Sequence, residues 1–387
     1  MPDFRFAARP FDEQVRFFAA KVNVPTARYD DLWREDHAHG FMVAGATRAA
    51  LLDDLRDAVH RAITDGETLT QFRSRFDDIV RARGWTGWTG EESAAGRSWR
   101  TRVIYDTNVR QSYNAGRFAQ LMHPDMIAAR PYWQYRHNDI GISRTPRPMH
   151  QAWHGLVRHY SDVWWRTHFP QNGWGCKCGT RALSAADVER LGLRVMDPAQ
   201  GSVDTRGIDP GFEYSPGEAA RSQAAAHAFG ERVAAMPASW RDTALRDAQR
   251  QAGDLFADAA PQIGRAIDAT TSPARTISVG MLQPAAAEAL GAASTLVDVR
   301  ADVVQQLLRD GVPDAFLRDI ATWLTRPSAI YRDTATGVVV YAWPIGEQLL
   351  QLRLADVGGS AVAIVDGSMG SADALPAPRY ERLGSGT

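Results

Sequence analysis

Hydrophobic residues recur at helical spacing through the first third of the chain. The pattern predicts three helices, over residues 46–66, 70–84 and 98–121. Apolar side chains follow one another every three or four positions in the first two helices, at Leu52, Leu55, Val59 and Ile63 and then at Phe72, Phe76 and Ile79. Gly66 and Gly84 stand where these two helices should stop.

The periodicity is lost between residues 131 and 181, where five tryptophans and three tyrosines gather. Residues 132–137 alternate as a short strand, and the rest of the segment is predicted to be loops held by aromatic side chains. Residues 197–217 contain three prolines and four glycines, a composition typical of a linker.

The last third of the chain has a different pattern. Residues 218–270 are alanine-rich and predicted to be helical. Strands are then predicted at 275–279 and 295–299, with helices at 283–291, 301–311 and 313–324. Four alternating segments follow, at 328–333, 337–343, 348–356 and 360–366, and these indicate an antiparallel sheet.

The sequence therefore predicts a multidomain α+β protein. It has a helical N-terminal region with an irregular aromatic-rich α/β part, and a small α+β C-terminal domain with an antiparallel sheet. The expected divisions are a domain at 1–196 (mainly helical over 1–122, aromatic- and cysteine-rich over 123–196), a linker at 197–217, a helical connector at 218–270, an α+β domain at 271–366 and a disordered tail at 367–387.

Composition narrows the class of protein. The 387 residues carry a formal net charge of −1, which excludes a strongly basic protein that coats nucleic acid. Charged residues interrupt each apolar run, so neither a signal peptide nor a membrane-spanning segment is expected. Two cysteines cannot form a disulfide framework, which favours a reducing compartment such as a cytoplasm.

Four blocks of sequence, in order, carry a resemblance to a known family. They are "KVNVPTARYDDLWREDHAHGFMVAGATRAALLDDL", "WRTRVIYDTNVRQSYNAGR", the pair "RTPRPMHQAWHG" and "FPQNGWGCKC", and "GFEYSPG". Over residues 20–217 the chain resembles the phage Mu F-like minor head proteins of the phage head morphogenesis family. The motif residues are Thr107, Asn108, Gly116, Arg117, Arg144, Arg147, His150, Trp174, Cys176 and Cys178.

The resemblance implies a structural protein of the virion, inside the head near the portal and in the host cytoplasm before assembly. Portal, coat or scaffold proteins would be its partners, DNA contact is left open, and no enzymatic activity is needed. Arginines of "RTPR" and at Arg97, Arg100 and Arg102 are suited to acidic portal surfaces. Some relatives have a C-terminal module similar to nucleases of the barnase–EndoU–RelE type, and residues 275–366 fit that shape loosely.

The cysteine segment raises three alternatives: a zinc site, a cysteine nucleophile, or a packing element. Zinc needs four ligands, and His150, Cys176 and Cys178 supply only three. Some relatives have a further Cys pair near Arg144 and Arg147 and a His before the Cys-x-Cys. Because those ligands are missing here, no metal is favoured, and the cysteines are expected to be reduced and buried against Trp174.

Catalytic and cofactor-binding residues are not predicted anywhere in the chain. No sequence feature sets a histidine beside a cysteine, and the segment containing His137 and Asn138 lacks the ββα pattern of an HNH nuclease. No histidine follows His227, so the C-terminal domain lacks the usual proton donor of a ribonuclease. The alternative function is an effector delivered from the head, with a ribonuclease-like toxin as its C-terminal domain.

The predicted helix over 98–121 has a polar face. Tyr105, Asn108 and Ser112 share it, and this face either connects the helix to the aromatic region by hydrogen bonds or is partly solvated. Arg102 and Asp106 were expected to form an ion pair, and Arg117 to anchor a carboxylate or a loop carbonyl.

Overall fold

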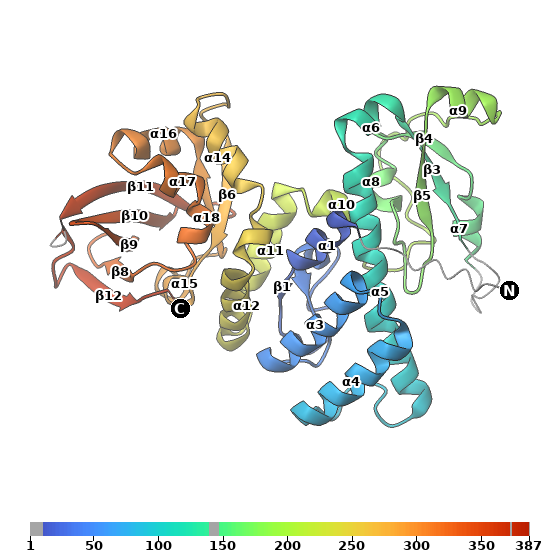
Figure 1. Cartoon of the computed structure of the whole chain (residues 1–387), viewed down its shortest axis with the longest axis horizontal. Helices are drawn as coiled ribbons and strands as arrows, with labels where there is room; N and C mark the ends of the chain where they lie inside the picture. Colours follow the sequence, from blue (N-terminus) through green and yellow to red (C-terminus); the bar gives the residue numbers. More distant parts are fainter. Residues whose placement is uncertain (1–10, 139–146, 372–373, 387) are drawn as a thin grey trace. The chain divides into compact units, whose positions relative to one another are not determined.

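The computed structural model describes residues 11–138, 147–371 and 374–386. The chain divides into two compact units (Figure 1). The first consists of residues 1–19 and 26–222, and the second of residues 20–25 and 223–387. These borders differ from the expected ones, because residues 197–217 fold with the first unit and residues 223–270 with the second.

The first unit is mainly helical, with short strands in its second half. Its elements are α1 (Asp12–Ala19), α2 (Asp36–His39), β2 (Gly40–Phe41), α3 (Ala49–Thr64), α4 (Leu69–Arg83), α5 (Ala94–Leu121), α6 (Pro124–Ala129), β3 (Tyr132–Arg136), α7 (Pro148–Ala152), β4 (Val157–His159), α8 (Trp165–His168), β5 (Gly179–Leu183), α9 (Ala185–Arg190) and α10 (Pro216–Ala219).

The three helices predicted from the apolar spacing are confirmed as α3, α4 and α5. Helix α4 begins with a capping box, in which Thr68 and Gln71 exchange side-chain and backbone hydrogen bonds. It ends at Gly84, whose φ of 56° is the left-handed conformation that glycine adopts without strain. Helix α5 starts earlier than predicted because the Ser93 hydroxyl accepts a hydrogen bond from the backbone N–H of Gly96.

Two hydrophobic cores lie within the first unit. The first is formed by α1, α3, α4 and the start of α5, and its large buried side chains are Phe18, Phe41, Phe72, Phe76, Trp85 and Trp88. The second lies around the antiparallel sheet in the order β4-β3-β5 and includes the buried side chains Phe118, Trp133, Tyr135, Trp153, Trp164, Trp165 and Phe169. Helix α5 contributes to both cores, with Ile104 in the first and Phe118 in the second.

Helix α5 also packs closely against two other helices. At Gly116 an added Cβ atom would lie 2.6 Å from the backbone nitrogen of Gln14 on α1. At Gly217 on α10 an added Cβ would lie 2.4 Å from the Cβ of Phe118. Both glycines are therefore required by close approach, and not by backbone conformation.

The segment 197–217 is not an extended linker. Ile208, Phe212 and Tyr214 are buried, and the first two belong to the aromatic core. Its prolines and glycines allow an irregular path across the core, which sequence composition alone does not distinguish from a solvated linker.

The second unit contains a seven-stranded sheet in the order β12-β8-β9-β10-β11-β7-β6, drawn in orange and red in Figure 1. Its elements are β1 (Val22–Asn23), α11 (Gln223–Ala234), α12 (Ala238–Arg250), α13 (Ala252–Leu255), α14 (Ala259–Ile267), β6 (Thr276–Met281), α15 (Pro284–Leu290), β7 (Leu296–Arg300), α16 (Ala301–Arg309), α17 (Asp314–Arg318), α18 (Ile320–Trp323), β8 (Ala329–Asp333), β9 (Val339–Ile345), β10 (Gln348–Asp356), β11 (Val362–Ser371) and β12 (Tyr380–Gly384).

The α+β class and the run of four antiparallel strands, β8 to β11, are confirmed. Strand β11 then pairs in parallel with β7, which joins the run to the β6–β7 pair. Residues 313–324 form two short helices, α17 and α18, divided at Asp319.

The expected disordered tail is instead part of the sheet. Strand β11 extends to Ser371, and β12 pairs antiparallel with β8, with Tyr380 opposite Asp333. Near this pairing the Arg379 guanidinium donates to the Asp333 carboxylate and lowers the pKa of that group to about 2. The glycine-, serine- and proline-rich composition of this segment did not indicate the short edge strand β12.

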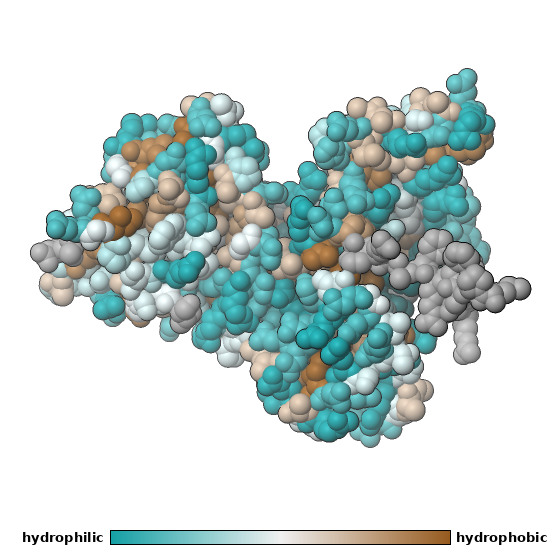
Figure 2. All heavy atoms as spheres, in the orientation of Figure 1, coloured by the Kyte–Doolittle hydropathy of each residue, from teal (hydrophilic) through white to brown (hydrophobic). Residues whose placement is uncertain are grey.

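Among the described residues, none of the helices is both long and apolar enough to span a bilayer. Hydrophilic residues cover most of the face drawn in Figure 2, and the hydrophobic residues on it form small separate groups.

Candidate functional site

The second core brings together four side chains that bind soft metal ions. His137 follows β3, His150 lies on α7, and Cys176 and Cys178 lie in the loop before β5. The pairing of β3 with β5 sets Arg136 opposite Gly179, so the residues just beyond this pair, His137 and Cys178, meet at the same end of the sheet.

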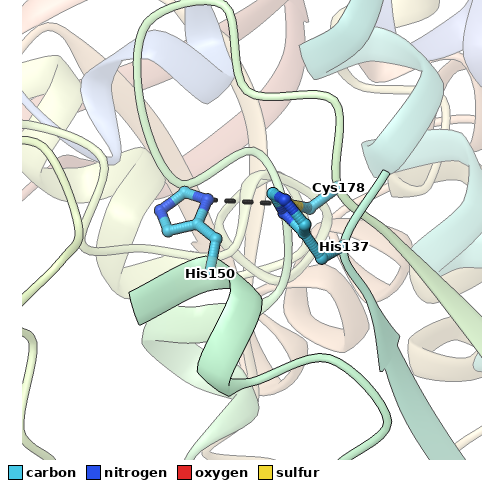
Figure 3. Close-up of side chains that lie close together, drawn as sticks. All are labelled: His137, His150 and Cys178. Atoms are coloured by element: carbon cyan, nitrogen blue, oxygen red, sulfur yellow. Dashed lines mark hydrogen bonds between the residues drawn. The ribbon is translucent and has the colours of Figure 1, made fainter. Parts of the chain in front are cut away.

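The distances between the ligand atoms are short. His137 Nδ1 lies 3.3 Å from Cys178 Sγ. His150 Nδ1 lies 3.5 Å from Cys178 Sγ and 3.6 Å from Cys176 Sγ. Figure 3 shows the two imidazole rings and the Cys178 side chain converging on one point. Among the described residues, His137, His150 and Cys178 form the group whose ligand atoms all lie within 4.8 Å of one another.

Hydrogen bonds and packing hold both histidines in place. His150 is fully buried, and its Nε2 donates to the Gly207 carbonyl at 2.9 Å, which leaves Nδ1 as the unprotonated nitrogen facing the sulfurs. Its ring stacks on Trp153 at a centroid distance of 5.0 Å. The backbone N–H of His137 donates to Nδ1 of His154 at 3.1 Å, which fixes the position of His137 at the end of β3.

The two thiols share one hydrogen bond and titrate as a pair. The hydrogen bond with Cys178 lowers the pKa of Cys176 well below its usual value, with a further contribution from His150. The same contact and burial raise the pKa of Cys178. Cys176 is 3% exposed and Cys178 is 5% exposed, and neither forms a disulfide. The expectation of reduced, buried cysteines therefore agrees with the structure.

An ion pair fastens the cysteine loop. Arg147 donates to both carboxylate oxygens of Asp209 at 3.1 Å and to the carbonyl of Trp174 at 2.6 Å. Asp209 also accepts from the backbone N–H of Trp174 at 2.8 Å. We call these bonds of Asp209 to Arg147 and Trp174 the Arg147–Asp209 clamp. A Cβ atom added at Gly173 would lie 2.4 Å from Asp209 Oδ2, so only glycine at this position allows the clamp to form. Arg147 therefore acts inside the fold, holding the loop that carries the cysteines.

The motif residue Trp174 and the arginine Arg100 differ from their expected positions. Trp174 does not cover the cysteines as expected: it is 43% exposed and packs against Phe212 with its ring edge-on. Arg100, expected on a portal-binding surface, is buried and donates to the Ala44 carbonyl. Burial lowers the pKa of Arg100. Arg144 lies outside the described residues.

The polar face of α5 contacts helical neighbours in the described structure. The Tyr105 hydroxyl donates to the Glu67 carbonyl at 2.7 Å, and Gln14 donates to Ser112 at 3.3 Å. Asn108 donates to the Ile104 carbonyl one turn earlier in its own helix at 2.9 Å. The bonds of Tyr105 and Ser112 connect α5 to the α3–α4 connection and to α1, which is neither of the two alternatives that the sequence suggested.

The charged residues of α5 also pair differently. Asp106 lies 3.9 Å from Arg110, in place of the expected Arg102. Arg117 donates to the amide oxygen of Gln120, whose amide group donates to Glu13 on α1 at 3.1 Å. Arg117 thus reaches a carboxylate through an intervening glutamine.

A cavity of about 830 Å³ borders the histidine and cysteine cluster within the first unit. Helix α5 forms one side, with Tyr105, Asp106 and Arg110, and the cluster residues His137, Cys176 and Cys178 line the other.

Sequence reasoning missed one pair of residues in the second unit. His227 on α11 lies in that unit, and its Nε2 is 2.8 Å from Asp298 Oδ2 on β7. The border of the C-terminal domain was predicted at residue 271, which left His227 outside the domain. The second unit begins its main segment at residue 223, so it does contain a histidine. A buried aspartate in an otherwise apolar strand, "TLVDV", was the available signal.

The motif residues Arg147, His150, Cys176 and Cys178 thus lie at the aromatic core, around the end of β3. The sequence model described as "Phage Mu protein F like protein" matches residues 53–181, from α3 to β5. Residues 53–181 are therefore similar to the phage Mu protein F-like family.

Two curated relatives extend this similarity. The chain is 38% identical over 230 residues to the "Putative capsid assembly protein F" of Escherichia phage Mu, covering 57% of this chain and 51% of the relative. It is 33% identical over 205 residues to the "Mu-like prophage FluMu F protein" of Haemophilus influenzae, covering 52% of this chain and 48% of the relative. The chain spans about half the length of each relative. No solved structure matches.

Proposed function

We propose that this chain is a structural, non-enzymatic protein of a bacteriophage head that acts in capsid assembly close to the portal. The observation that carries the proposal is the Mu F-like match over residues 53–181, which coincides with α5, the sheet around β3 and the cysteine loop. A relative at 38% identity is described as a capsid assembly protein, and the same role is proposed here.

The start of α5 offers a contact surface for such a role. Trp99 is 51% exposed, and Arg97 and Arg102 beside it are exposed as well. Exposed tryptophan flanked by arginine is the composition that dominates binding energy at protein interfaces. We propose that this surface contacts an acidic face of the portal or of another head protein.

The first test measures incorporation into particles. Mass spectrometry of purified particles is expected to find the chain at far lower copy number than the coat protein, and the chain should co-purify with the portal. Its absence from particles would refute the proposal. Deleting residues 98–183, which removes most of α5 and the cysteine loop, is expected to abolish incorporation.

A point variant locates the contact without destroying the fold. Trp99→Ala should lower incorporation about tenfold or more, because an anchoring tryptophan is lost. Tyr29→Ala, which removes an aromatic side chain that is also exposed, is the matched control and should incorporate normally. Equal incorporation of both variants would show that the start of α5 is not the contact.

The rival function is a ribonuclease-like effector in the second unit, and the His227–Asp298 pair is the observation that favours it. The pair is largely buried between α11 and β7. The arginine-lined cavity of the unit, about 580 Å³ and bordered by Arg246, Arg250 and Arg326, does not include His227 in its lining. Because a phosphate-binding group and the proton-transfer pair are not assembled in that cavity, we propose that His227 is structural.

The full-length chain is expected to leave total RNA intact in a gel assay. Cleavage by the wild type that disappears in His227→Gln and in Asp298→Asn would establish the rival. Folding of each variant, followed by circular dichroism, separates a lost reaction from a lost fold.

A further inference from the structure

We propose that His137, His150, Cys176 and Cys178 form a four-ligand site for a structural zinc ion. The site goes beyond the assembly role, and its experiment does not depend on that role. The sequence offered three ligands at most, because nothing in the spacing of the chain places His137 beside the cysteines. The pairing of β3 with β5 supplies the fourth ligand.

The distances match a tetrahedral site. With Zn–S bonds of about 2.3 Å and Zn–N bonds of about 2.0 Å, tetrahedral geometry separates a nitrogen and a sulfur ligand by about 3.5 Å. Three of the four nitrogen–sulfur separations in the cluster are 3.3, 3.5 and 3.6 Å, and Cys176 joins the group through its contact with His150. Each is as short as ligands on one ion require, and this agreement is reached by side chains from three separate segments.

The chemistry of the donor set selects the ion. Two thiolates and two imidazoles in a tetrahedral arrangement are the ligands of zinc, whereas calcium and magnesium take oxygen ligands. Two thiolates also neutralise a divalent cation, so the loaded site would carry no net charge into a core where unpaired charge is costly. Both cysteines are buried in that core.

The surroundings of His150 fit a metal ligand. Its Nε2 proton is committed to the Gly207 carbonyl, so the lone pair on Nδ1 is directed at both sulfurs. A histidine that donates its second nitrogen to a carbonyl is the arrangement that orients metal-bound imidazoles. The Arg147–Asp209 clamp gives the cysteine loop a fixed path next to this ligand.

Four protein ligands leave no open coordination position, so the site is structural and not catalytic. It would join the end of β3, the helix α7 and the loop before β5, a part of the fold with little regular secondary structure. The ion would add the cross-links that short strands and loops cannot supply by hydrogen bonding alone.

The test is metal analysis of the full-length chain, purified without chelator from zinc-supplemented cells. We expect about one zinc per chain by mass spectrometry of the metal. Protein in which zinc is replaced by Co²⁺ should show the visible bands of tetrahedral cobalt and a thiolate-to-cobalt charge-transfer band. Full-length protein that contains no zinc and takes up neither ion on reconstitution would overturn the proposal.

Variants assign the ligands. Cys176→Ser, Cys178→Ser, His137→Gln and His150→Gln should each weaken zinc binding by more than about 100-fold, above the loss typical of changes to residues that only orient a ligand. His159→Gln is the control, since this histidine bonds Ser161 and lies outside the cluster. If a variant fails to fold, the cobalt spectrum of the wild type still reports the number of thiolates. Full zinc content and an unchanged cobalt spectrum in His137→Gln would refute the four-ligand site.

Discussion

The close approach of α1 to α5 at Gly116 makes a quantitative prediction for Gly116→Ala. Taken alone, the change should stabilise α5 by about 1 kcal/mol, because alanine favours a helix interior over glycine. The new Cβ would however lie 2.6 Å from the Gln14 backbone nitrogen and 2.6 Å from Cε2 of Phe11. A backbone atom cannot rotate away, so α1 must move outward.

The displacement is costly because Gln14 is buried and anchored to α5. Its side chain donates to the Ser112 hydroxyl at 3.3 Å and to the Val109 carbonyl at 3.4 Å. Overpacking of this kind costs about 1–3 kcal/mol, and three contacts below 3 Å, two of them to backbone atoms of Gln14, favour the upper part of that range. After the helix gain is subtracted, the free energy of unfolding should fall by about 1–2 kcal/mol.

Urea unfolding of the full chain, followed by tryptophan fluorescence, measures this change, since nine of the twelve tryptophans lie in the first unit. Gly253→Ala is the matched control: it lies in helix α13, and nothing lies within 4 Å of its added Cβ. That variant should be stabilised or unchanged. A Gly116→Ala protein as stable as the wild type would refute the close backbone contact between α1 and α5.

Three further predictions concern buried polar groups. Burial lowers the pKa of His168 from 6.5 to about 4, so the folded state resists protonation of this side chain. The free energy of unfolding should therefore keep its full value above pH 6.5 and fall by about 3 kcal/mol by pH 4. Urea titrations with EDTA present should show a smaller fall with pH in His168→Gln. Asp209→Asn should weaken the clamp on Arg147 and speed proteolysis of the cysteine loop, with Asp204→Asn, an exposed control, unchanged. Asp247→Ala should lower the midpoint of thermal unfolding, because the buried backbone N–H of Asn23 loses its acceptor at a cost of about 1–3 kcal/mol. An unchanged midpoint would contradict the hydrogen bond between Asn23 and Asp247.

Regular periodicity explains which parts of the fold could be predicted. Helix α4 combines apolar spacing with a left-handed stop at Gly84, and strands β8 to β11 are runs of five residues or more that are rich in apolar side chains, so local sequence determines both. The segment 197–217 has no period, since Ile208, Phe212 and Tyr214 are buried by an irregular path. Composition alone therefore assigned it to a linker.

The candidate site was predictable only in part, for a similar reason. His150, Cys176 and Cys178 were identified from their residue types and from the family resemblance. His137 joins them through the register of β3 on β5, and Asp209 through a clamp from a segment 62 residues away from Arg147. Long-range pairing of this kind leaves no trace in local spacing.

The second unit takes six of its residues, 20–25, from near the start of the chain. Val22 and Val24 are fully buried, and the backbone N–H of Asn23 donates to Asp247 on α12. The C-terminal half is consequently not a cassette that recombination could exchange as one contiguous block. A replacement would have to accept these six residues, or bring a matching change in the segment 20–25 that supplies them.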